Sequence, residues 1–416
     1  MAEGPLAIVA DRLIDGTGRD PIEAAVVVVD HDRIAAVGSR AAVRIPDGAE
    51  IVDGDDLTVL PGFVDAHVHL AGQSGVDFNR LLMTRRSMLL LMAVPNAKAT
   101  LEAGVTTVRD AGLSPASVRD AIDAGYFAGP RCHMAVTILS QSGGHGDPAM
   151  PCGSELHMDC GMDVPDSVVD GPETMRRRVR EVLAAGADWI KLCTSGGVLS
   201  PSDHPDAAQF TIEEIAVAVD EAASQGKRVM AHAMSTAGIK NALRGGVTSI
   251  EHGCLLDEEA IAMMKERGAW LVPTLVAPRD VVAAAGHGRS VPEVMVEKAR
   301  AISVRHMESF RLAVEAGVNI AMGTDSAVGP HGGNLREPAL MVEGGMTPLE
   351  AIAASTGAPA RLLRREGEIG TLEPGKFADV VVVRGDPLSD IAGLADPDRI
   401  RLVLKGGETA KDLERT

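Results

Sequence analysis

One stretch of the sequence decides the fold: Phe63-Val64-Asp65-Ala66-His67-Val68-His69. It is a short, mostly apolar run of the kind that forms a buried strand, and it carries two histidines. Side chains alternate along a strand, so His67 and His69 project to the same side and can reach one metal ion. A His-X-His pair alone is more often a packed or solvated pair than a ligand pair. Whether His67 and His69 are a ligand pair or a packed or solvated pair must therefore be judged from the rest of the sequence.

Seven more apolar runs follow this one, and helical stretches rich in Ala, Glu and Arg separate many of them. The eight candidate strands are Gly62 to Leu70, Thr106 to Ala111, Cys132 to Leu139, Trp189 to Thr194, Arg228 to Met234, Thr248 to Gly253, Trp270 to Leu275 and Asn319 to Asp325. The candidate helices include Glu173 to Ala185, Ile212 to Ser224, Asp257 to Arg267 and Val294 to Ala316. Such strand-helix units predict an α/β fold, a closed (β/α)8 TIM-like barrel, with an open doubly wound sheet as the alternative.

Both ends of the chain have a β pattern instead, with short β-branched runs between turn signals. The expected strands are Leu6 to Ala10, Ala24 to Asp30, Arg33 to Val37, Ala378 to Val383 and Ile400 to Leu404. We expect the two termini to form one small β-sandwich domain, residues 1–60 plus 366–416. The barrel, residues 61–365, is then a single domain inserted between them.

Composition narrows the class of protein further. Hydrophobic residues make up 45% of the chain but aromatic residues only 2%, so the core must be mainly aliphatic. The net charge of −18 argues against nucleic acid or a membrane surface as partner and favours a small-molecule substrate. Neither a signal segment nor a long apolar span is recognised, and we expect a cytoplasmic protein. The five cysteines, without CxxC spacing, are expected to be reduced thiols.

Polar residues able to bind metal lie at the ends of several other candidate strands. The fourth strand carries Lys191, the fifth ends near His232, the sixth near His252 and the eighth near Asp325. Each has an ordinary alternative, such as a packed core histidine or a helix cap. A lysine inside an apolar run can reach solvent, pair with Asp325, or react with CO2 to form an anionic carbamate. Barrel active sites are built at these strand ends, so the joint pattern predicts a metal site.

The order of these residues resembles the binuclear metal branch of the amidohydrolase superfamily. The phrases Val59-Leu60-Pro61-Gly62-Phe63-Val64-Asp65-Ala66-His67 and Gly370-Thr371-Leu372-Glu373-Pro374-Gly375-Lys376-Phe377-Ala378-Asp379 resemble its crossings between sandwich and barrel. Further motifs are Ser142-Gly143-Gly144-His145-Gly146-Asp147, Ser195-Gly196-Gly197, Ile250-Glu251-His252-Gly253 and Pro330-His331-Gly332-Gly333-Asn334. They resemble a branch with Xaa-Pro and Xaa-Arg-type dipeptidases, imidazolonepropionase-like amidohydrolases and amidases, including a mycotoxin amidase.

The resemblance implies a set of metal ligands and catalytic residues. His67, His69 and Asp325 would hold one divalent cation, His232 and His252 a second, and N-carboxylated Lys191 would bridge both. Zn2+ suits these ligands, with Mn2+ or Co2+ as alternatives. The nucleophile would be a hydroxide between the two ions, and Asp325 would carry its proton to the departing amine. His252 and His145 complete the expected catalytic residues, and a homo-oligomer, for example an octamer, is the expected assembly.

Loops above the barrel should supply the substrate contacts. The loop Gln141 to Asp166 is rich in Gly, Pro and Met, and we expect it to form a lid or pocket wall. His145 within it is the expected contact for an oxyanion or carboxylate, and His331 after the eighth strand is a second expected substrate contact. In one respect the sequence departs from the dipeptidase pattern, because Met234 stands where a carboxylate-binding tyrosine is typical.

The function that follows is hydrolysis of an amide bond in a small substrate, such as a dipeptide or an N-acyl amino acid. Because of Met234, an amidase or carbamate hydrolase acting on a xenobiotic or mycotoxin amide is the main alternative. A deaminase or cyclic amide hydrolase on the same barrel is less favoured, since such deaminases usually lack the lysine of the fourth strand. A non-enzymatic scaffold would have no reason to keep six polar groups buried together.

Overall fold

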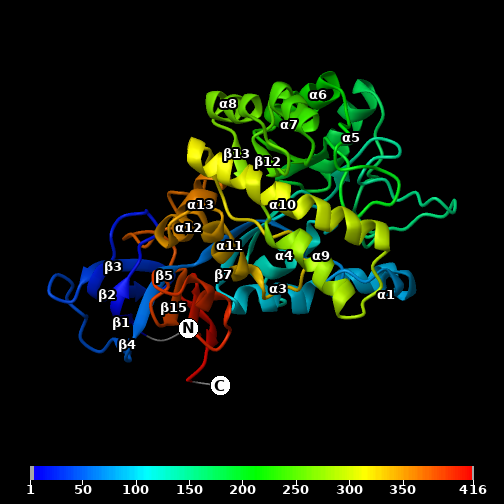
Figure 1. The fold of residues 1–416 in the computed structure, drawn as a ribbon. Coiled ribbons are helices and arrows are strands. Elements are labelled where there is room, and N and C mark those ends of the chain that lie inside the picture. Colours follow the sequence, from blue (N-terminus) through cyan, green and yellow to red (C-terminus); the bar gives the residue numbers. More distant parts are fainter. Residues whose placement is uncertain (1–3, 415–416) are drawn as a thin grey trace.

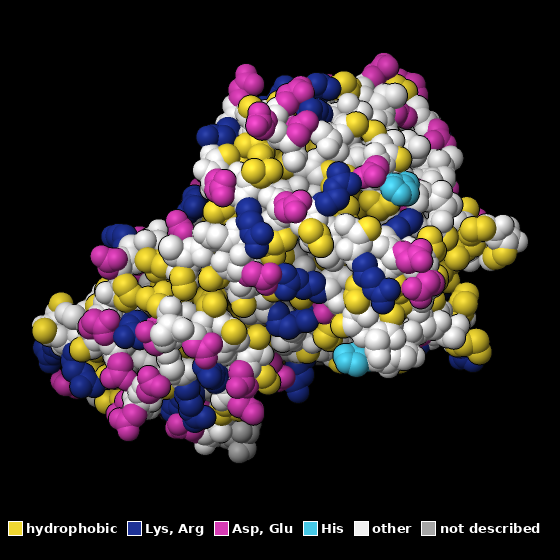
Figure 2. Space-filling model, in the orientation of Figure 1, with side chains coloured by type: hydrophobic (Ala, Val, Ile, Leu, Met, Phe, Trp, Pro, Cys, Tyr) yellow, Lys and Arg dark blue, Asp and Glu magenta, His cyan; other side chains and the backbone are white. Residues whose placement is uncertain are grey.

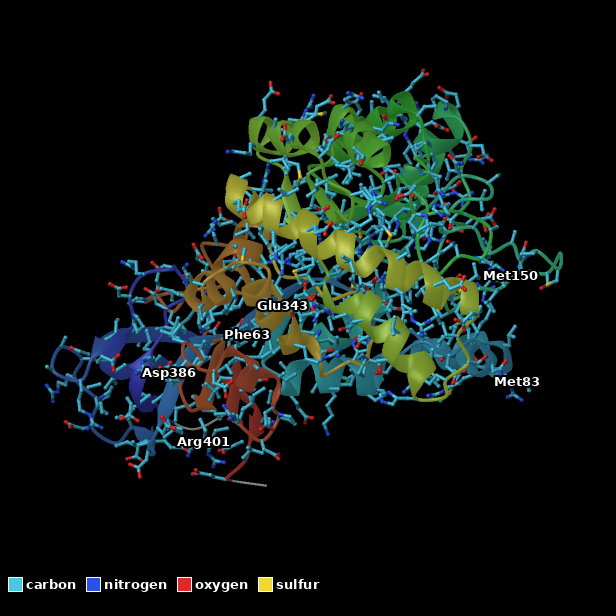
Figure 3. All side chains as sticks on the ribbon, in the orientation of Figure 1. Phe63, Met83, Met150, Glu343, Asp386 and Arg401 are labelled. Carbon is cyan, nitrogen blue, oxygen red and sulfur yellow. The ribbon has the colours of Figure 1, made fainter. Side chains whose placement is uncertain are left out.

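The computed structural model describes residues 4–414, and Figure 1 shows its two parts: a barrel surrounded by helices and a sheet built from both termini. The expected fold class is confirmed. Phe63 lies where the two parts meet, Arg401 in β16 and Asp386 beyond β15 lie in the part with the terminal sheet, and Met83 and Met150 lie at the opposite edge (Figure 3). The domain boundaries at residues 60 and 366 stay a prediction, and residues 1–3 and 415–416 lie outside the described part.

The barrel strands are parallel and occur in two hydrogen-bonded groups, β6-β7-β8 and β14-β13-β12-β11-β10-β9. The strands are β6 (Phe63–Val68), β7 (Val105–Asp110), β8 (Arg131–Met134), β9 (Ile138–Leu139), β10 (Trp189–Cys193), β11 (Arg228–Ala233), β12 (Ser249–His252), β13 (Trp270–Val272) and β14 (Asn319–Ile320). The segment after β14 meets β6 through Ala66 N to Met322 O at 2.9 Å and Asp325 N to His67 O at 2.7 Å. These contacts link the last strand to the first.

The third expected strand, Cys132 to Leu139, is divided into β8 and β9. Val136 between them has a φ of 63°, a left-handed conformation that a β-branched residue rarely adopts. The chain turns there, so β8 pairs with β7 whereas β9 pairs with β10. The turn places the loop after β9 over the end of the barrel that carries the histidines.

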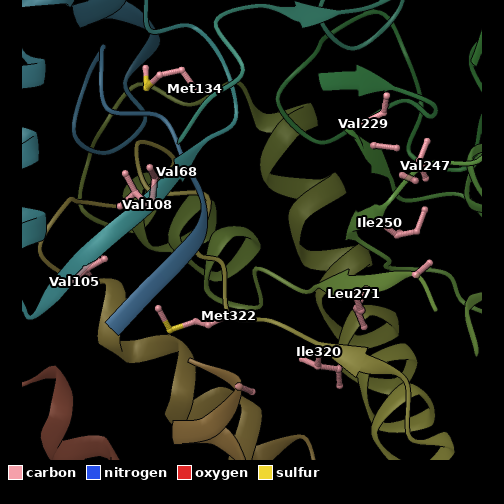
Figure 4. Packing of buried hydrophobic residues seen from close by; sticks show 14 of the residues in the cluster. Val68, Val105, Val108, Met134, Val229, Val247, Ile250, Leu271, Ile320 and Met322 are labelled. Carbon is pink, nitrogen blue, oxygen red and sulfur yellow. The ribbon is translucent and has the colours of Figure 1, made fainter. Parts of the chain in front are cut away.

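Helices follow the barrel strands and cover their outer side (Figure 1). They are α1 (Phe78–Met83), α2 (Arg86–Leu91), α3 (Ala93–Glu102), α4 (Ser117–Asp123), α5 (Pro172–Ala184), α6 (Ile212–Ser224), α7 (Thr236–Gly245), α8 (Glu258–Arg267), α9 (Val276–Gly286), α10 (Glu293–Ala316), α11 (Glu337–Glu343), α12 (Pro348–Ala354) and α13 (Gly357–Leu363), with 3-10 turns at Asn334–Arg336 and Ile391–Ala395. The core between strands and helices is aliphatic, as expected, and Figure 4 shows Val108, Ile250, Leu271 and Ile320 within it.

The terminal sheet is mixed. Its strands are β1 (Leu6–Leu13), β2 (Ile22–Asp30), β3 (Arg33–Ser39), β4 (Glu50–Val52), β5 (Leu57–Pro61), β15 (Val380–Arg384), β16 (Ile400–Lys405) and β17 (Glu408–Asp412). The two ends of the chain join where β5 pairs with β15 antiparallel and with β1 parallel. Acidic and basic side chains are mixed over the face shown in Figure 2. Within residues 4–414, no helix is long and apolar enough to span a membrane.

Candidate active site

His67, His69 and Asp325 lie together at the mouth of the barrel. The Oδ1 atom of Asp325 is 3.5 Å from Nε2 of His67 and 3.0 Å from Nε2 of His69. All three potential ligand atoms lie within 4.8 Å of one another. No other group of three or more His, Cys, Asp or Glu side chains among residues 4–414 meets this criterion, so Cys152, His157 and Cys160 do not form one.

The other three predicted residues adjoin this group. Nζ of Lys191 is 3.5 Å from Nε2 of His67. The ring centre of His252 is 5.2 Å from that of His67 and 4.5 Å from that of His232. Lys191, His232 and His252 are all buried, and each lines the cavity above the barrel. The structure therefore brings together six side chains that come from five different strand ends.

The hydrogen bonds behind His67 and His69 suit them to bind a cation. Nδ1 of His67 donates to the carboxylate of Glu251 at 2.8 Å, and Nδ1 of His69 donates to the carbonyl of Gly112 at 2.9 Å. Each neutral imidazole then carries its lone pair on Nε2, the atom that faces Asp325. Metal-binding histidines are commonly oriented by this kind of outer hydrogen bond. The donor set thus fits divalent cations that accept nitrogen and oxygen ligands.

Burial and neighbouring charges set the protonation of the cluster. Burial lowers the pKa of His67, His232 and His252 well below the ordinary value, which keeps these imidazoles neutral. Burial also lowers the pKa of Lys191 and increases the share of neutral amine. For Asp325, burial opposes ionisation, but His67, His69 and Lys191 together outweigh it and hold the pKa below the usual range. For His69, burial opposes protonation, but the hydrogen bond and the charge of Asp325 outweigh it and raise the pKa. The cluster therefore combines neutral imidazoles at His67, His232 and His252 with a His69–Asp325 pair.

A buried ion pair beneath the cluster was not singled out by the sequence patterns. In β7, Arg109 donates to both carboxylate oxygens of Glu251 in β12, at 2.8 and 3.0 Å. Both side chains are fully buried, and the guanidinium lies 4.6 Å from the ring centre of Trp189. Glu251 in turn accepts the hydrogen bond from His67. The signal in the sequence was a charged residue inside each of two predicted barrel strands, since such a residue needs a partner when it is buried.

Replacing Arg109 with methionine should destabilise the protein strongly. The variant leaves the Glu251 carboxylate buried without its cation, and breaking such a pair typically costs about 3–5 kcal/mol. A matched control is Arg180→Met, which breaks the contact of an exposed arginine with Glu221 and should change the stability far less, since Glu221 keeps Arg176 as a partner. Urea unfolding of both variants measures the difference. An Arg109→Met protein as stable as the control would contradict the assigned role of this pair.

The cavity above the cluster has two arms. The first arm, with about 930 Å³ of open space, is lined by Phe78, Leu81, Leu113, Ile138 and Met158, among others. The second arm, with about 440 Å³, is lined by Val198, Met234, Pro278, Val281 and Ile302, among others. Both arms share His145, Leu199, His232, His252, Asp325 and Val328. A bond at the junction of the arms therefore lies beside Asp325 and His145.

The two histidines expected to contact substrate have different positions. The ring of His145 lines both arms and stacks on His232, with ring centres 4.3 Å apart. His331 is buried, and it is not among the residues that line either arm. Its Nε2 donates to the carbonyl of His69 at 3.1 Å, and its Nδ1 is 3.1 Å from the hydroxyl of Thr100. Both ring nitrogens of His331 are thus used within the protein.

Comparison with known proteins identifies the family. Residues 58–410 match the model of the amidohydrolase family. The chain belongs to this family. It is 36% identical to the ochratoxinase of Aspergillus niger over 97% of this chain and 86% of the relative. A solved Xaa-Pro dipeptidase with bound methionine superposes with a TM-score of 0.89 at 35% identity, over 97% of this chain and 99% of that one.

A second solved structure, a prolidase complexed with N-methylphosphonate-L-proline, is also similar, with a TM-score of 0.89 and 34% identity over 98% of this chain and all of that one (100%). This amidohydrolase is accordingly a hydrolase that acts on carbon–nitrogen bonds. His67, His69 and Asp325 provide a candidate metal site of the type that the family uses. The identity of the metal and the N-carboxylation of Lys191 remain predictions.

We expect the purified amidohydrolase to carry about two divalent ions per chain, because the clustered donors exceed what one four-coordinate ion needs. Removing the ions with a chelator should abolish hydrolysis, and adding Zn2+ should restore it. Elemental analysis of the protein after dialysis measures the stoichiometry directly. Saturation at one ion per chain would contradict the two-metal arrangement even if the enzyme were active.

Proposed function

We propose that this amidohydrolase uses two divalent cations to cleave the amide bond of a small substrate with apolar groups on both sides, such as an N-acyl derivative of an apolar amino acid. The observation that carries the proposal is the pair of apolar arms meeting at His145 and Asp325. A scissile amide at this junction places its acyl group in one arm and its amine substituent in the other.

The residues expected to hold the cations are His67, His69 and Asp325 for one and His232 and His252 for the other, with N-carboxylated Lys191 between them. Bound there, the cations would act as Lewis acids toward the carbonyl group and would make water a better nucleophile at neutral pH.

Asp325 is placed to move the proton. Its carboxylate is the acidic side chain of the cluster and lines both arms, so it lies next to any bond held at their junction. The low pKa of Asp325, which neighbouring His67, His69 and Lys191 hold down against the effect of burial, keeps the carboxylate ionised at neutral pH, which is the form that can accept a proton from water. The same carboxyl group can then donate that proton to the amine nitrogen as the C–N bond breaks.

The arms offer little to a charged substrate. Apart from Lys191 and Asp325 of the predicted metal site, the one Asp, Glu, Lys or Arg side chain among the described residues lining the first arm is Asp77. Apart from Asp325, the described lining of the second arm has none. Met234, which stands in place of the expected tyrosine, contributes to the apolar wall of the second arm. A substrate carboxylate or ammonium in the second arm would be buried without a partner, which is costly.

A matched set of substrates tests this specificity. We expect N-hexanoyl-phenylalaninamide to be cleaved with a higher kcat/KM than N-hexanoyl-phenylalanine, and both to exceed the zwitterion Ala-Phe. Each unpaired charge should lower kcat/KM by at least about tenfold, since tenfold corresponds to only about 1.4 kcal/mol. Liberated amine is measured for each compound with the Zn2+-loaded enzyme. If the enzyme cleaves none of the three compounds, the proposed function is overturned.

A free dipeptide is the second candidate substrate, and one contact supports it. Asp77 on the wall of the first arm can pair with an α-ammonium group. Faster cleavage of Ala-Phe or Ala-Pro than of the neutral amide would favour this candidate.

The cytoplasmic location and the homo-oligomeric state also stay predictions. Exposed apolar side chains on α1 and α2, Leu82, Met83, Met88 and Leu91, support self-association.

A further inference from the structure

The ring of His145 packs closely against His232 and Gly197. One face stacks on His232, with an angle of 23° between the ring planes. If residue 197 carried a side chain, its Cβ atom would lie within 2.3–2.6 Å of three atoms of the His145 ring, so only glycine leaves room there. The ring nevertheless lines both arms of the cavity. Its position is therefore set closely by the surrounding protein.

The edge of the ring is fixed by a hydrogen-bonded chain. Nδ1 of His145 is 2.8 Å from Oγ of Ser200, and Ser200 donates its hydroxyl proton to the carboxylate of Asp203. A serine hydroxyl has one proton to donate. Because Asp203 receives that proton, Ser200 must accept from His145, and Nδ1 of His145 must carry a hydrogen. In the neutral ring, Nε2 is then unprotonated.

Asp203 and Ser200 are themselves anchored. The Asp203 side chain is 4% exposed and accepts hydrogen bonds from the backbone of Gly197 and from Gln209, both at 3.2 Å. Lys298 of α10 donates to the carbonyl groups of Gly197, Ser200 and Asp203, at 3.3, 2.8 and 2.5 Å. Its ammonium also lies 3.6 Å from the carboxylate of Asp203. One lysine thus ties down the whole segment that orients His145.

We propose that Ser200 and Asp203 are positioning residues that hold His145 with Nδ1 protonated and with Nε2 free to contact the substrate as a hydrogen-bond acceptor. The contact with substrate rests on the proposed function, whereas the orientation of the ring does not. A lone pair on Nε2 recognises a donor, and an amide substrate offers its N–H group. His145 then orients the scissile amide at the junction of the two arms.

A double-mutant cycle tests whether Ser200 acts through His145. Ser200→Ala should lower kcat/KM by about 10- to 100-fold, the cost of a misplaced active-site group, without loss of metal. In the His145→Ala background, the same change should cost less than about twofold, because its target is gone. Ser200→Thr keeps the hydroxyl and should restore most of the activity. Equal losses from Ser200→Ala in both backgrounds would overturn the proposal.

Ser142→Ala is the matched control. Ser142 also donates to an aspartate, Asp170, but in an exposed part of the loop that carries His145 and outside the residues lining the arms. The control should leave kcat/KM unchanged within about twofold, since surface changes away from a site have small effects. A loss comparable to that of Ser200→Ala would show that any lost serine–aspartate bond in the loops above the barrel slows the enzyme, against a specific role for Ser200.

A second measurement does not depend on catalysis. In the Zn2+-loaded enzyme with 15N-labelled histidine, the signals of His145 are assigned by their absence in His145→Gln. We expect them to show a protonated Nδ1 and an unprotonated Nε2, and to change in Ser200→Ala but not in Ser142→Ala. A protonated Nε2 in the neutral wild-type ring would overturn the proposal. If none of the amides is cleaved, the proposed function fails, and this spectrum still decides the orientation of His145.

Discussion

Replacing Asp325 with asparagine is expected to lower kcat by about 10³- to 10⁴-fold while most of the bound metal is retained. Asparagine keeps an oxygen that can bind a cation, but it cannot accept the proton that leaves the attacking water. Loss of general acid–base catalysis costs up to about 10⁴-fold, and here one carboxylate serves both proton transfers. Substrate affinity should change little.

The backbone makes asparagine a well-matched replacement at this position. Asp325 has a φ of 58°, in the left-handed region that asparagine and aspartate tolerate better than other non-glycine residues. Asp325→Ala would add backbone strain and lose a ligand at once, so it would confuse the two effects. We therefore compare kcat and metal content in Asp325→Asn alone. A variant with two ions and nearly normal turnover would rule out Asp325 as the proton carrier.

Lys191→Ala should abolish measurable hydrolysis and lower the metal content below two ions per chain. The amine is buried, 3.5 Å from Nε2 of His67, and only its N-carboxylated form offers oxygen ligands to two cations. Without that bridge the second ion loses a shared ligand, so metal content and hydrolysis should fall together. Elemental analysis and activity assays on the same preparation separate loss of metal from loss of turnover.

Bicarbonate provides the control for this prediction. If the carbamate forms from CO2, metal-free wild-type protein should take up two ions faster and more completely with bicarbonate than in CO2-free buffer. Lys191→Ala has no amine to react, so bicarbonate should not change its metal uptake. Full activity of Lys191→Ala, or metal uptake by the wild type that ignores bicarbonate, would refute the N-carboxylated bridge.

Local sequence signals predicted the regular elements well where the residues that begin or end a helix or strand lie at that boundary themselves. The expected helix Ile212 to Ser224 agrees with α6, because Thr211 and Glu214 form a capping box at its start. The expected third strand was wrong as a single element. The strand breaks at Val136, whose left-handed backbone conformation no local propensity favours. The break is determined by tertiary pairing, because β8 pairs with β7 whereas β9 pairs with β10.

The six expected ligands could be selected from sequence because each one lies within or just after a recognisable strand pattern, and parallel strands of a barrel end on the same side. Composition likewise implied an aliphatic core. The polar partners of the site could not be selected in this way. Arg109 and Glu251 are 142 residues apart, and His145 and Ser200 are 55 residues apart, so no spacing rule connects them.

The sequence by itself thus determined the barrel, the sheet from both termini and the residue types at the barrel mouth, because hydrophobic periodicity and strand ends are local properties of the chain. Only the tertiary structure decided which nitrogen of His67 and His69 faces Asp325, and that His331 is engaged within the protein. It also decided that the cavity has two apolar arms. Tautomers and cavity walls depend on contacts between distant segments, which exist only once the barrel has closed.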